Sequence, residues 1–227
     1  MLDHTMVRFF NRNILDVPVA MCDVETTGKD PWADGVCQVA VVRFEGGKEV
    51  ASFSSYVDPG RPIPEKTTAI HGITDEMVKG AEPIEAVFAR PEVRQLLDGA
   101  HPAAYCNHFD RQFIPPGAFP DHRWPWIDPL VLIRSADRYA KGSGRHKLVA
   151  ACERHGVELT NAHSAEFDAR AAGQLFYVLV PKVCGPDWTV GEYLTWQREQ
   201  ENVEWSRFME WLSQQLEKES ESASVQR

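Results

Sequence analysis

Two carboxylates lie at the end of the most hydrophobic run of the chain, Val17–Glu25. Asp23 and Glu25 are two positions apart, and side chains two positions apart on a β-strand point to the same face. Burying both without a cation would be costly, and carboxylate oxygens are ligands that Mg²⁺ uses in proteins. The pair therefore predicts a hard-metal site, although a strand that frays into the polar turn Thr26-Thr27-Gly28 also fits it.

Two further carboxylates lie next to apolar segments. Asp110 follows the apolar run His101–Asn107, and α/β sheets usually bind ligands at the carboxyl ends of their strands. An aspartate in that place also fits the N-cap of a short turn. Asp168 lies in the early turns of a helix expected over Ala165–Val180, close to the apolar stripe of that helix. This position does not favour a purely solvated role for Asp168.

A histidine precedes the last of these carboxylates by five residues. His163 lies at or before the start of the expected helix, so an imidazole on a loop and the carboxylate of Asp168 on a helix could face one cavity. Imidazole is a suitable general base near neutral pH. Taken alone, His163 also fits an ordinary surface loop.

The elements that must position these residues are those of an α/β protein with a sheet of mixed direction. Val17–Glu25, Val36–Phe44 and Lys48–Val57 are predicted strands, and the glycines of Glu45-Gly46-Gly47 permit a tight hairpin between the last two. The chain thus opens as an antiparallel meander. Two more strands are expected at His101–Asn107 and Trp126–Leu130, and helices near Asp75–Lys79 and Pro91–Leu97 and over Leu130–Tyr139, His146–His155 and Ala165–Val180.

The last forty residues differ in character from the rest. The segment Pro181–Pro186, where a helix is not expected to continue, is followed by Thr189-Val190-Gly191-Glu192, which fits a capping box. An acidic amphipathic helix is expected from there to about Glu219, with its apolar spacing strongest from Trp205 onward. Such a face usually packs on its own domain, and the alternative is a docking helix for a partner or a second copy. We expect one domain over residues 1–180 and an acidic C-terminal helix and tail over residues 187–227.

Composition sets the class of protein. The chain has 227 residues, 43% of them hydrophobic and 25% charged, which is enough to bury a core without disulfides or a structural metal. No run is long and apolar enough to span a bilayer. The five cysteines are odd in number and form no CxxC pair, as is typical of a reducing compartment. These features predict a cytoplasmic globular protein.

The net charge of −9 does not exclude a nucleic-acid substrate. Residues 187–227 carry nine acidic and four basic side chains, so more than half of the excess lies in the C-terminal segment. If four of the remaining acids held two divalent cations, the rest of the chain would be close to neutral.

Together the segments resemble a known family. Asp23-Val24-Glu25-Thr26-Thr27-Gly28, Phe109-Asp110 and His163-x-Ala165-x-x-Asp168-Ala169 are similar to the three ordered motifs of the DEDDh, or DnaQ-like, 3′→5′ exonucleases. That family is typified by the proofreading epsilon subunit of bacterial DNA polymerase III. The resemblance covers about residues 17–180 and implies a ribonuclease H-like mixed β-sheet flanked by helices, with the C-terminal helix as an extension.

The resemblance also implies a mechanism. Two divalent cations, Mg²⁺ or Mn²⁺, would be held by Asp23, Glu25, Asp110 and Asp168, with Asp23 bridging both, and His163 would take a proton from the attacking water. The expected reaction is hydrolysis of the phosphodiester bond at the 3′ end of DNA, with single strands preferred and 5′-mononucleotides released. DNA 3′ ends are the expected partner, and a polymerase or a second copy could contact the C-terminal helix.

Several residues are candidates for contact with the substrate. Thr26 and Thr27 could meet the terminal nucleotide through backbone N–H or hydroxyl groups, or simply form the turn with Gly28. Ile70, His71 and Ile73, in a segment similar to the family's substrate-side "hGIt" motif, could stack on terminal bases or anchor a helix-entry loop. The basic stretch has two interpretations: it could bind backbone phosphate, or it could be a solvated, mobile loop. Its residues are Lys141, Arg145, His146 and Lys147.

One position departs from the family. An Asn usually stands four residues before the second-motif Asp, and here Cys106 stands there, with Asn107 one step later. Either the turn is remodelled or Asn107 replaces the missing amide, which bears on how Asp110 is positioned.

Two other functions remain open. One is an exoribonuclease acting on short RNA, because no residue is identifiable as a reader of the 2′-hydroxyl. The other is a non-catalytic module on the same fold that binds nucleic acid or a polymerase. The intact cluster of carboxylates argues against the second, since a binding module has no need of it.

Overall fold

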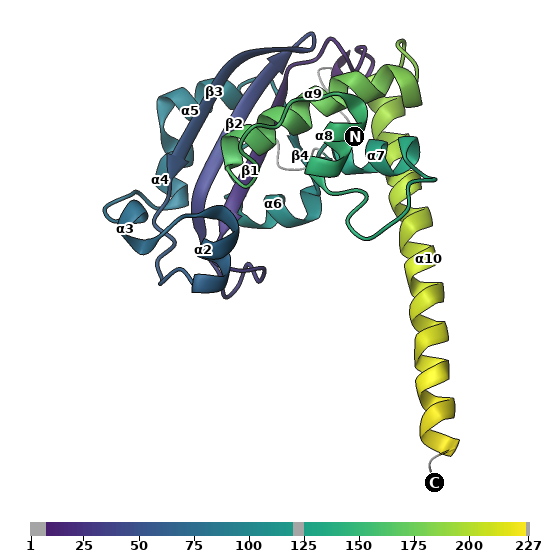
Figure 1. Cartoon of the computed structure of the whole chain (residues 1–227). Helices are drawn as coiled ribbons and strands as arrows, with labels where there is room; N and C mark the ends of the chain where they lie inside the picture. The colour runs from purple at the N-terminus through teal and green to yellow at the C-terminus, as the bar shows by residue number, and fades with distance from the viewer. Residues whose placement is uncertain (1–7, 120–124, 226–227) are drawn as a thin grey trace.

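A four-stranded sheet of mixed direction lies at the centre of the molecule (Figure 1). The computed structural model describes residues 8–119 and 125–225, the stretch 217–225 by its backbone alone. The strands β1 (Val19–Thr26), β2 (Val36–Glu45), β3 (Lys48–Tyr56) and β4 (His101–Ala104) are arranged in the order β3-β2-β1-β4. The first three are antiparallel neighbours, and β4 runs parallel to β1. The predicted meander and mixed sheet are confirmed.

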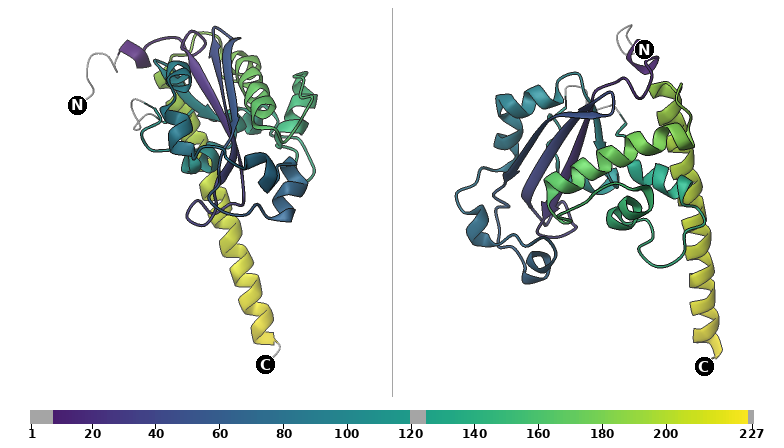
Figure 2. Two further views of the ribbon diagram at one scale, coloured as in Figure 1. Left: turned by 90° about the vertical axis from the view of Figure 1, so that its left-hand side faces the viewer. Right: turned by 45° about the horizontal axis from the view of Figure 1, so that its top comes forward.

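The alternation of side chains along β1 separates two cores. Val19 and Met21 face one side, where they pack with apolar residues of α9 (Ala165–Val183). Ala20, Cys22 and Val24 face the other side, which is covered by residues from α4 (Ile84–Ala89) and α5 (Pro91–Leu97). Figure 2 shows the sheet between these two helical layers. Because side chains two apart share a face, Asp23 and Glu25 project on the α9 side.

Helix α9 approaches the sheet very closely. Gly173 faces the ring of Phe44 on β2, and a Cβ atom at position 173 would lie 2.2 Å from that ring. Only glycine fits this contact without a shift of the aromatic ring or the helix. Further helices of the body are α2 (Glu65–His71), α3 (Asp75–Val78), α6 (Asn107–Phe113), α7 (Pro129–Ala136) and α8 (Leu148–His155).

The region after β4 differs from the expectation. β4 ends at Ala104 instead of Asn107, and Asn107 already opens α6. Trp126–Leu130, expected to be a short strand, forms only an isolated parallel bridge between Ile127 and Ala103. That prediction was wrong because the side chain of Asp128 caps α7, which begins at the next residue.

The segment around Ile70 and His71 is helical. Both residues lie in the helix α2, which ends at Gly72 with a φ of 76°, and Ile73 lies between α2 and α3. A left-handed residue at that place is a common way for helices to end, and glycine adopts it without strain.

The C-terminal helix α10 (Val190–Val225) begins as predicted but extends further than Glu219. Thr189 and Glu192 form the reciprocal hydrogen bonds of a capping box. Its first turns are buried in the body through Val190, Tyr193 and Leu194. Beyond them the helix projects away from the body in every view (Figures 1 and 2). Among the described residues, no helix combines the length and apolar character that crossing a membrane requires.

The apolar stripe of α10 is exposed where it is strongest. Of the two alternatives for this face, packing on the body does not hold from Val203 onward. The exposed fractions there are between 41% and 63%, for Val203, Trp205, Phe208, Met209, Trp211 and Leu216.

Candidate active site

The carboxyl end of β1 has an open edge that α6 fills. β4 pairs with β1 only from Val19 to Cys22, so the last residues of β1 have no strand on that side. The N–H group of Val24 instead donates a hydrogen bond to Oδ1 of Asp110, at 3.1 Å. This bond is buried and fixes the Asp110 carboxylate beside Asp23 and Glu25.

Helix α9 brings the fourth carboxylate to the same place. Oδ2 of Asp168 accepts a hydrogen bond from the peptide N–H of His163, at 3.1 Å. Oδ1 of Asp168 is buried and has no hydrogen-bond partner among the described residues. Glu25, His163 and Asp168 each offer one ligand atom, and these three atoms lie within 4.8 Å of one another. A buried oxygen without a partner is what a cation site leaves when no ion is present.

The electrostatics of the cluster follow from crowding and burial. Burial, followed by the charges of Asp110, Asp168 and Glu25, raises the pKa of Asp23 well above its usual value. Burial raises the pKa of Glu25 to about 7 and that of Asp110 to about 8, the latter against the lowering effect of the Val24 N–H. Burial also raises the pKa of Asp168. Burial and mutual repulsion disfavour the ionised form of these carboxylates, and a hard divalent cation would stabilise that form.

His163 lies at the exposed rim of the cluster in an uncommon backbone conformation. Its φ is 66°, a left-handed value that costs energy for a residue other than glycine. Two hydrogen bonds hold the loop around it in place. The peptide N–H of His163 donates to Asp168, and the N–H of Ala165 donates to Oε1 of Gln38, at 3.1 Å. The start of α9 is thereby tied to β2.

The two threonines after Glu25 are buried and largely used within the turn. The hydroxyl of Thr27 donates to Oδ1 of Asp34 and accepts from the N–H of Gly35, each at 3.0 Å, and its own N–H donates to the Gly35 carbonyl. The hydroxyl of Thr26 donates to the carbonyl of Gly28. These bonds favour the turn role for both side chains.

The three substrate-side candidates on and after α2 have different surroundings. Ile70 is 58% exposed, whereas Ile73 is buried in a small cluster that includes Cys37. Nδ1 of His71 accepts a hydrogen bond from the N–H of Ile73, and Nε2 lies 3.8 Å from Sγ of Cys37. Burial lowers the pKa of His71. Of the three, Ile70 is the side chain that an incoming base could reach most easily.

A further carboxylate, not singled out from the sequence, orients α6. Asp128 is buried and accepts hydrogen bonds from the N–H groups of Cys106, Asn107 and Leu130, at 2.9 to 3.0 Å. Burial raises its pKa to about 6. An Asp followed by Pro129 is a typical helix start, and that signal could have found its role at α7.

The departure at Cys106 is explained by the same contacts. Cys106 has a φ of 66° and precedes α6. The side-chain amide of Asn107 is buried and donates to the carbonyl of Trp126, at 3.2 Å, so it is a structural group in this chain. The turn is remodelled around Asp128, and α6 still presents Asp110 to β1.

Comparison with known sequences places the chain in a family. An exonuclease family model of the RNase T type matches residues 21–176. The PolC-type DNA polymerase III of Streptococcus thermophilus is 32% identical over 177 residues, covering 76% of this chain and 12% of the polymerase. The PolC-type DNA polymerase III of Lacticaseibacillus paracasei is 34% identical over 172 residues, which again cover 12% of the polymerase. The chain therefore spans only a small part of the length of these relatives.

Solved structures share the fold. Exonuclease X in complex with 5′ overhanging duplex DNA aligns with a TM-score of 0.62 at 22% identity, over 79% of this chain and 99% of that one. Escherichia coli exonuclease I in complex with a dT13 oligonucleotide aligns with a TM-score of 0.60 at 22% identity, over 74% and 42% of the two chains. The ribonuclease H-like sheet predicted from the motifs is confirmed. Because the family model spans all four carboxylates and His163, the chain belongs to the RNase T family of exonucleases, the DnaQ-like group that its motifs resemble.

Proposed function

We propose that this chain is a metal-dependent 3′→5′ exonuclease that hydrolyses the phosphodiester bond at the 3′ end of DNA, prefers single strands and releases 5′-mononucleotides. The observation that carries the proposal is the convergence of Asp23, Glu25, Asp110 and Asp168 at the end of β1, with a buried oxygen of Asp168 left without a partner. No structural ion pair explains this cluster among the described residues.

The four carboxylates would hold the cofactor. Two divalent cations, Mg²⁺ or Mn²⁺, would neutralise phosphate charge and provide hydroxide near neutral pH when bound. Asp23 has the other three carboxylates around it, which suits a shared ligand. Asp110 is held by Val24, and Asp168 by the backbone of His163, so both carboxylates are oriented in advance.

His163 would accept the proton of the attacking water. Its ring lies close to Glu25 and Asp168 but is exposed, so the proton can pass on to solvent. The hydrogen bond from its backbone to Asp168 links the position of the base to that of a metal ligand.

The substrate and the setting are supported by the comparisons. Two structural neighbours contain DNA, one a duplex with a 5′ overhang and one a thymidine single strand. The relatives are polymerases, which supports a proofreading role beside a polymerase. Exposed Ile70 would contact the terminal base, and the backbone N–H of Thr26 would contact the terminal nucleotide. We further propose that residues 1–180 form the exonuclease domain and that the protein acts in the cytoplasm.

The test uses end-labelled single-stranded DNA, duplex DNA and RNA of one sequence, each with Mg²⁺ or Mn²⁺. We expect stepwise shortening from the 3′ end, fastest on single-stranded DNA, and complete loss of cleavage with EDTA or with Asp23→Ala. Asp16→Ala is the matched control, because Asp16 is an exposed aspartate before the other end of β1.

Each alternative has its own outcome in this experiment. Faster shortening of RNA would indicate the exoribonuclease. Binding without cleavage would indicate the non-catalytic module. Internal cuts, or cleavage that survives Asp23→Ala, would contradict the proposed centre.

A further inference from the structure

A second concave surface adjoins the carboxylate cluster. A pocket of about 800 Å³ opens between α6, α7, the loop that follows α7, and α10. Its size is within the range of pockets that bind small molecules or a nucleotide. Arginines and aromatic rings stand out among its lining residues, which include Arg134, Arg138, Arg145, His146, Trp205 and Phe208.

The pocket lining carries four arginines and three carboxylates in a protein whose net charge is −9. Arg138, Arg145 and Arg207 line it and form no ion pair with a described carboxylate, whereas Arg134 pairs with Glu204. Two other carboxylates line it, Asp128 and Glu201. Asp128 is already satisfied by three backbone N–H groups, and Glu201 accepts from the side chain of Gln197. Three arginines are therefore available for an anionic ligand.

The opposite wall presents aromatic rings. Trp205 and Phe208 of α10 are 63% and 47% exposed, and their ring centroids are 5.7 Å apart at an interplanar angle of 37°. Exposed rings beside unpaired arginines are the combination that single-stranded nucleic acid uses, since bases stack on the rings and phosphates pair with the arginines.

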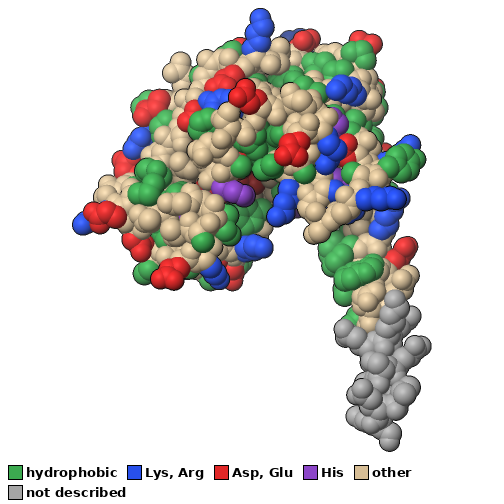
Figure 3. Space-filling view, viewed as in Figure 1, with side chains coloured by type: hydrophobic (Ala, Val, Ile, Leu, Met, Phe, Trp, Pro, Cys, Tyr) green, Lys and Arg blue, Asp and Glu red, His purple; other side chains and the backbone are tan. Residues whose placement is uncertain are grey.

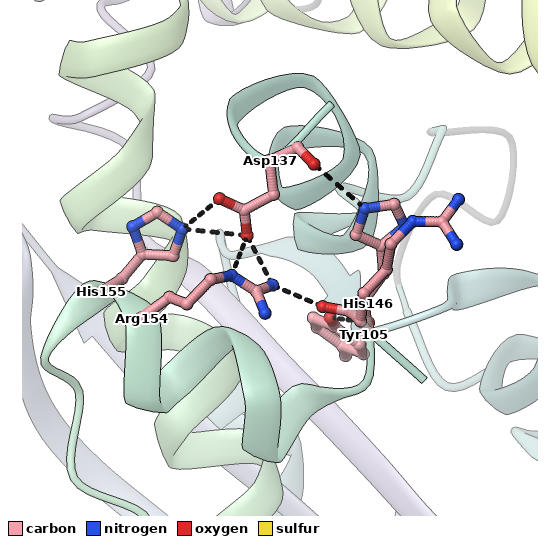
Figure 4. A network of polar contacts seen from close by, with 6 residues as sticks. Tyr105, Asp137, His146, Arg154 and His155 are labelled. Atoms are coloured by element: carbon pink, nitrogen blue, oxygen red, sulfur yellow. Dashed lines mark hydrogen bonds and ion pairs between the residues drawn. The ribbon is translucent and has the colours of Figure 1, made fainter. Parts of the chain in front are cut away.

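The loop that carries Arg145 and His146 is held in place by a polar network (Figure 4). Arg154 donates to the carboxylate of Asp137 and to the carbonyl of Arg145. The hydroxyl of Tyr105 donates to the carbonyl of His146, at 2.6 Å, and His155 lies 3.1 Å from the Asp137 carboxylate. These bonds favour an ordered loop over a solvated mobile one.

Helix α6 joins the pocket to the carboxylate cluster. Cys106 and His108 line the pocket, and Asp110 lies only two residues further along the same chain segment. Residues in a helix are about 1.5 Å apart along its axis, so the two sites are adjacent. In Figure 3 the body and α10 enclose a hollow, and Lys and Arg side chains gather along its sides.

We propose that this pocket binds the single-stranded nucleic acid that follows the terminal nucleotides in the active site. Arg138 and Arg145 bind backbone phosphates, and Trp205 and Phe208 stack with bases. The proposal rests on the proposed function, because it takes the 3′ end to lie at the carboxylate cluster. It assigns α10 a role in holding the substrate.

The experiment compares a long and a short strand. Fluorescence anisotropy in EDTA, where no strand is cut, gives the affinity of fluorescein-labelled oligothymidylates of 12 and 3 nucleotides. The variants are R138E/R145E, W205A and the control K48E. Lys48 is exposed at the hairpin end of the sheet, opposite the carboxylates, and K48E makes the same charge change as each arginine replacement.

We expect R138E/R145E to weaken binding of the 12-mer at least about tenfold and to lower the slope of log affinity against log salt by about 1.4, as loss of two phosphate contacts on a single strand predicts. W205A should weaken binding of the 12-mer about 5- to 150-fold, the range for one lost base stack. The ratio of the affinity for the 12-mer to the affinity for the 3-mer should fall in R138E/R145E and in W205A. In K48E this ratio should equal that of the wild type.

Three results would overturn the inference. They are equal losses for the two strand lengths, losses of the same size in K48E, and unchanged affinity in the pocket variants. A change of molecular mass in the variants, measured by light scattering, would instead make the pocket an interface between copies. Hydrolysis of the p-nitrophenyl ester of thymidine monophosphate depends on the carboxylate cluster alone. If the protein does not hydrolyse this ester, the proposed function is contradicted, whereas the inference about the pocket is judged from the binding measurements.

Discussion

At the scale of single residues, the carboxylate cluster determines how stability depends on pH. Burial raises the pKa of Glu25 from 4.5 to about 7 and that of Asp110 from 3.8 to about 8 in the metal-free fold. The folded state then binds more protons than the unfolded one between about pH 4 and pH 8. The stability that this provides is present at low pH and is lost as the pH rises through 7 to 8.

We therefore expect the melting temperature in EDTA to fall from pH 5.5 to pH 8. Mg²⁺ should raise it more at pH 8 than at pH 6, since binding requires deprotonated carboxylates. Thermal melts followed by circular dichroism, with and without Mg²⁺, measure both effects. A metal-free melting temperature that rises over this interval would contradict the raised pKa values.

The imidazole of His163 and its left-handed backbone conformation could each matter for activity, and two substitutions distinguish these contributions. His163→Ala should lower kcat about 10²- to 10⁴-fold, the usual contribution of a general base. His163→Asn should lower it similarly, although Asn tolerates the left-handed conformation. The Mg²⁺-induced rise in melting temperature should persist in both. Full activity in His163→Asn would mean that the backbone, and not the imidazole, is what matters.

The candidate carboxylates that the structure brings together could be selected from the sequence because their types and spacing are local. Asp23 and Glu25 end one strand, and the motif of His163 and Asp168 lies within six residues. Asp128 and Gln38 were missed because their partners are distant in sequence: the start of α6 for Asp128 and the start of α9 for Gln38. No local pattern encodes those contacts.

At the scale of elements, the close packing of α9 on β2 sets the position of Asp168. Gly173→Ala should destabilise the fold by about 1 to 3 kcal/mol, because the new methyl group overlaps the Phe44 ring. Chemical denaturation measures the loss. Gly117→Ala is the matched control, since a Cβ at position 117 has no neighbour within 4 Å.

Phe44→Leu in the Gly173→Ala background should recover part of the loss by removing the ring. If the double variant is no more stable than the sum of the two single changes predicts, the contact is not the cause.

The long elements of the fold could be predicted from periodicity, whereas of the short helices only α3 and α5 were predicted, beside their prolines and acidic residues. β1, β2, β3 and α9 contain enough residues to show alternation or a helical stripe. α2, α4 and α6 have six or seven residues each, fewer than two full turns, and tertiary contacts decide their conformation. The misassigned strand at Trp126–Leu130 reflects an apolar composition that fits a buried helix start equally well.

At the scale of the whole molecule, α10 has an attached part and a projecting part. Its buried residues end at Gln197, which bonds to Trp126 and to the N–H of Asp128. Truncation after Glu210 removes Trp211 and the residues beyond it. Because Trp211 and Leu216 are exposed, we expect the free energy of unfolding to change by no more than about 0.5 kcal/mol. A loss of several kcal/mol in chemical denaturation would show that the projecting part supports the fold.

The projection itself could not be predicted, because an amphipathic stripe does not tell what covers it. The sequence pattern is the same whether the partner surface belongs to the body, to a ligand or to another chain. Here the body covers Tyr193 and Leu194, while Trp205 and Phe208 line an open pocket.

The order of the strands has a consequence for how the protein loses activity under mild denaturation. β1 pairs with β2 along its whole length and with β4 from Val19 to Cys22, so its amides should exchange with deuterium only when most of the sheet opens. The His163 loop, exposed and strained, should open at a far lower free energy. Inactivation should therefore precede unfolding: turnover fails first while the acidic pair on β1 stays in place, and such molecules would regain activity at once when the denaturant is diluted.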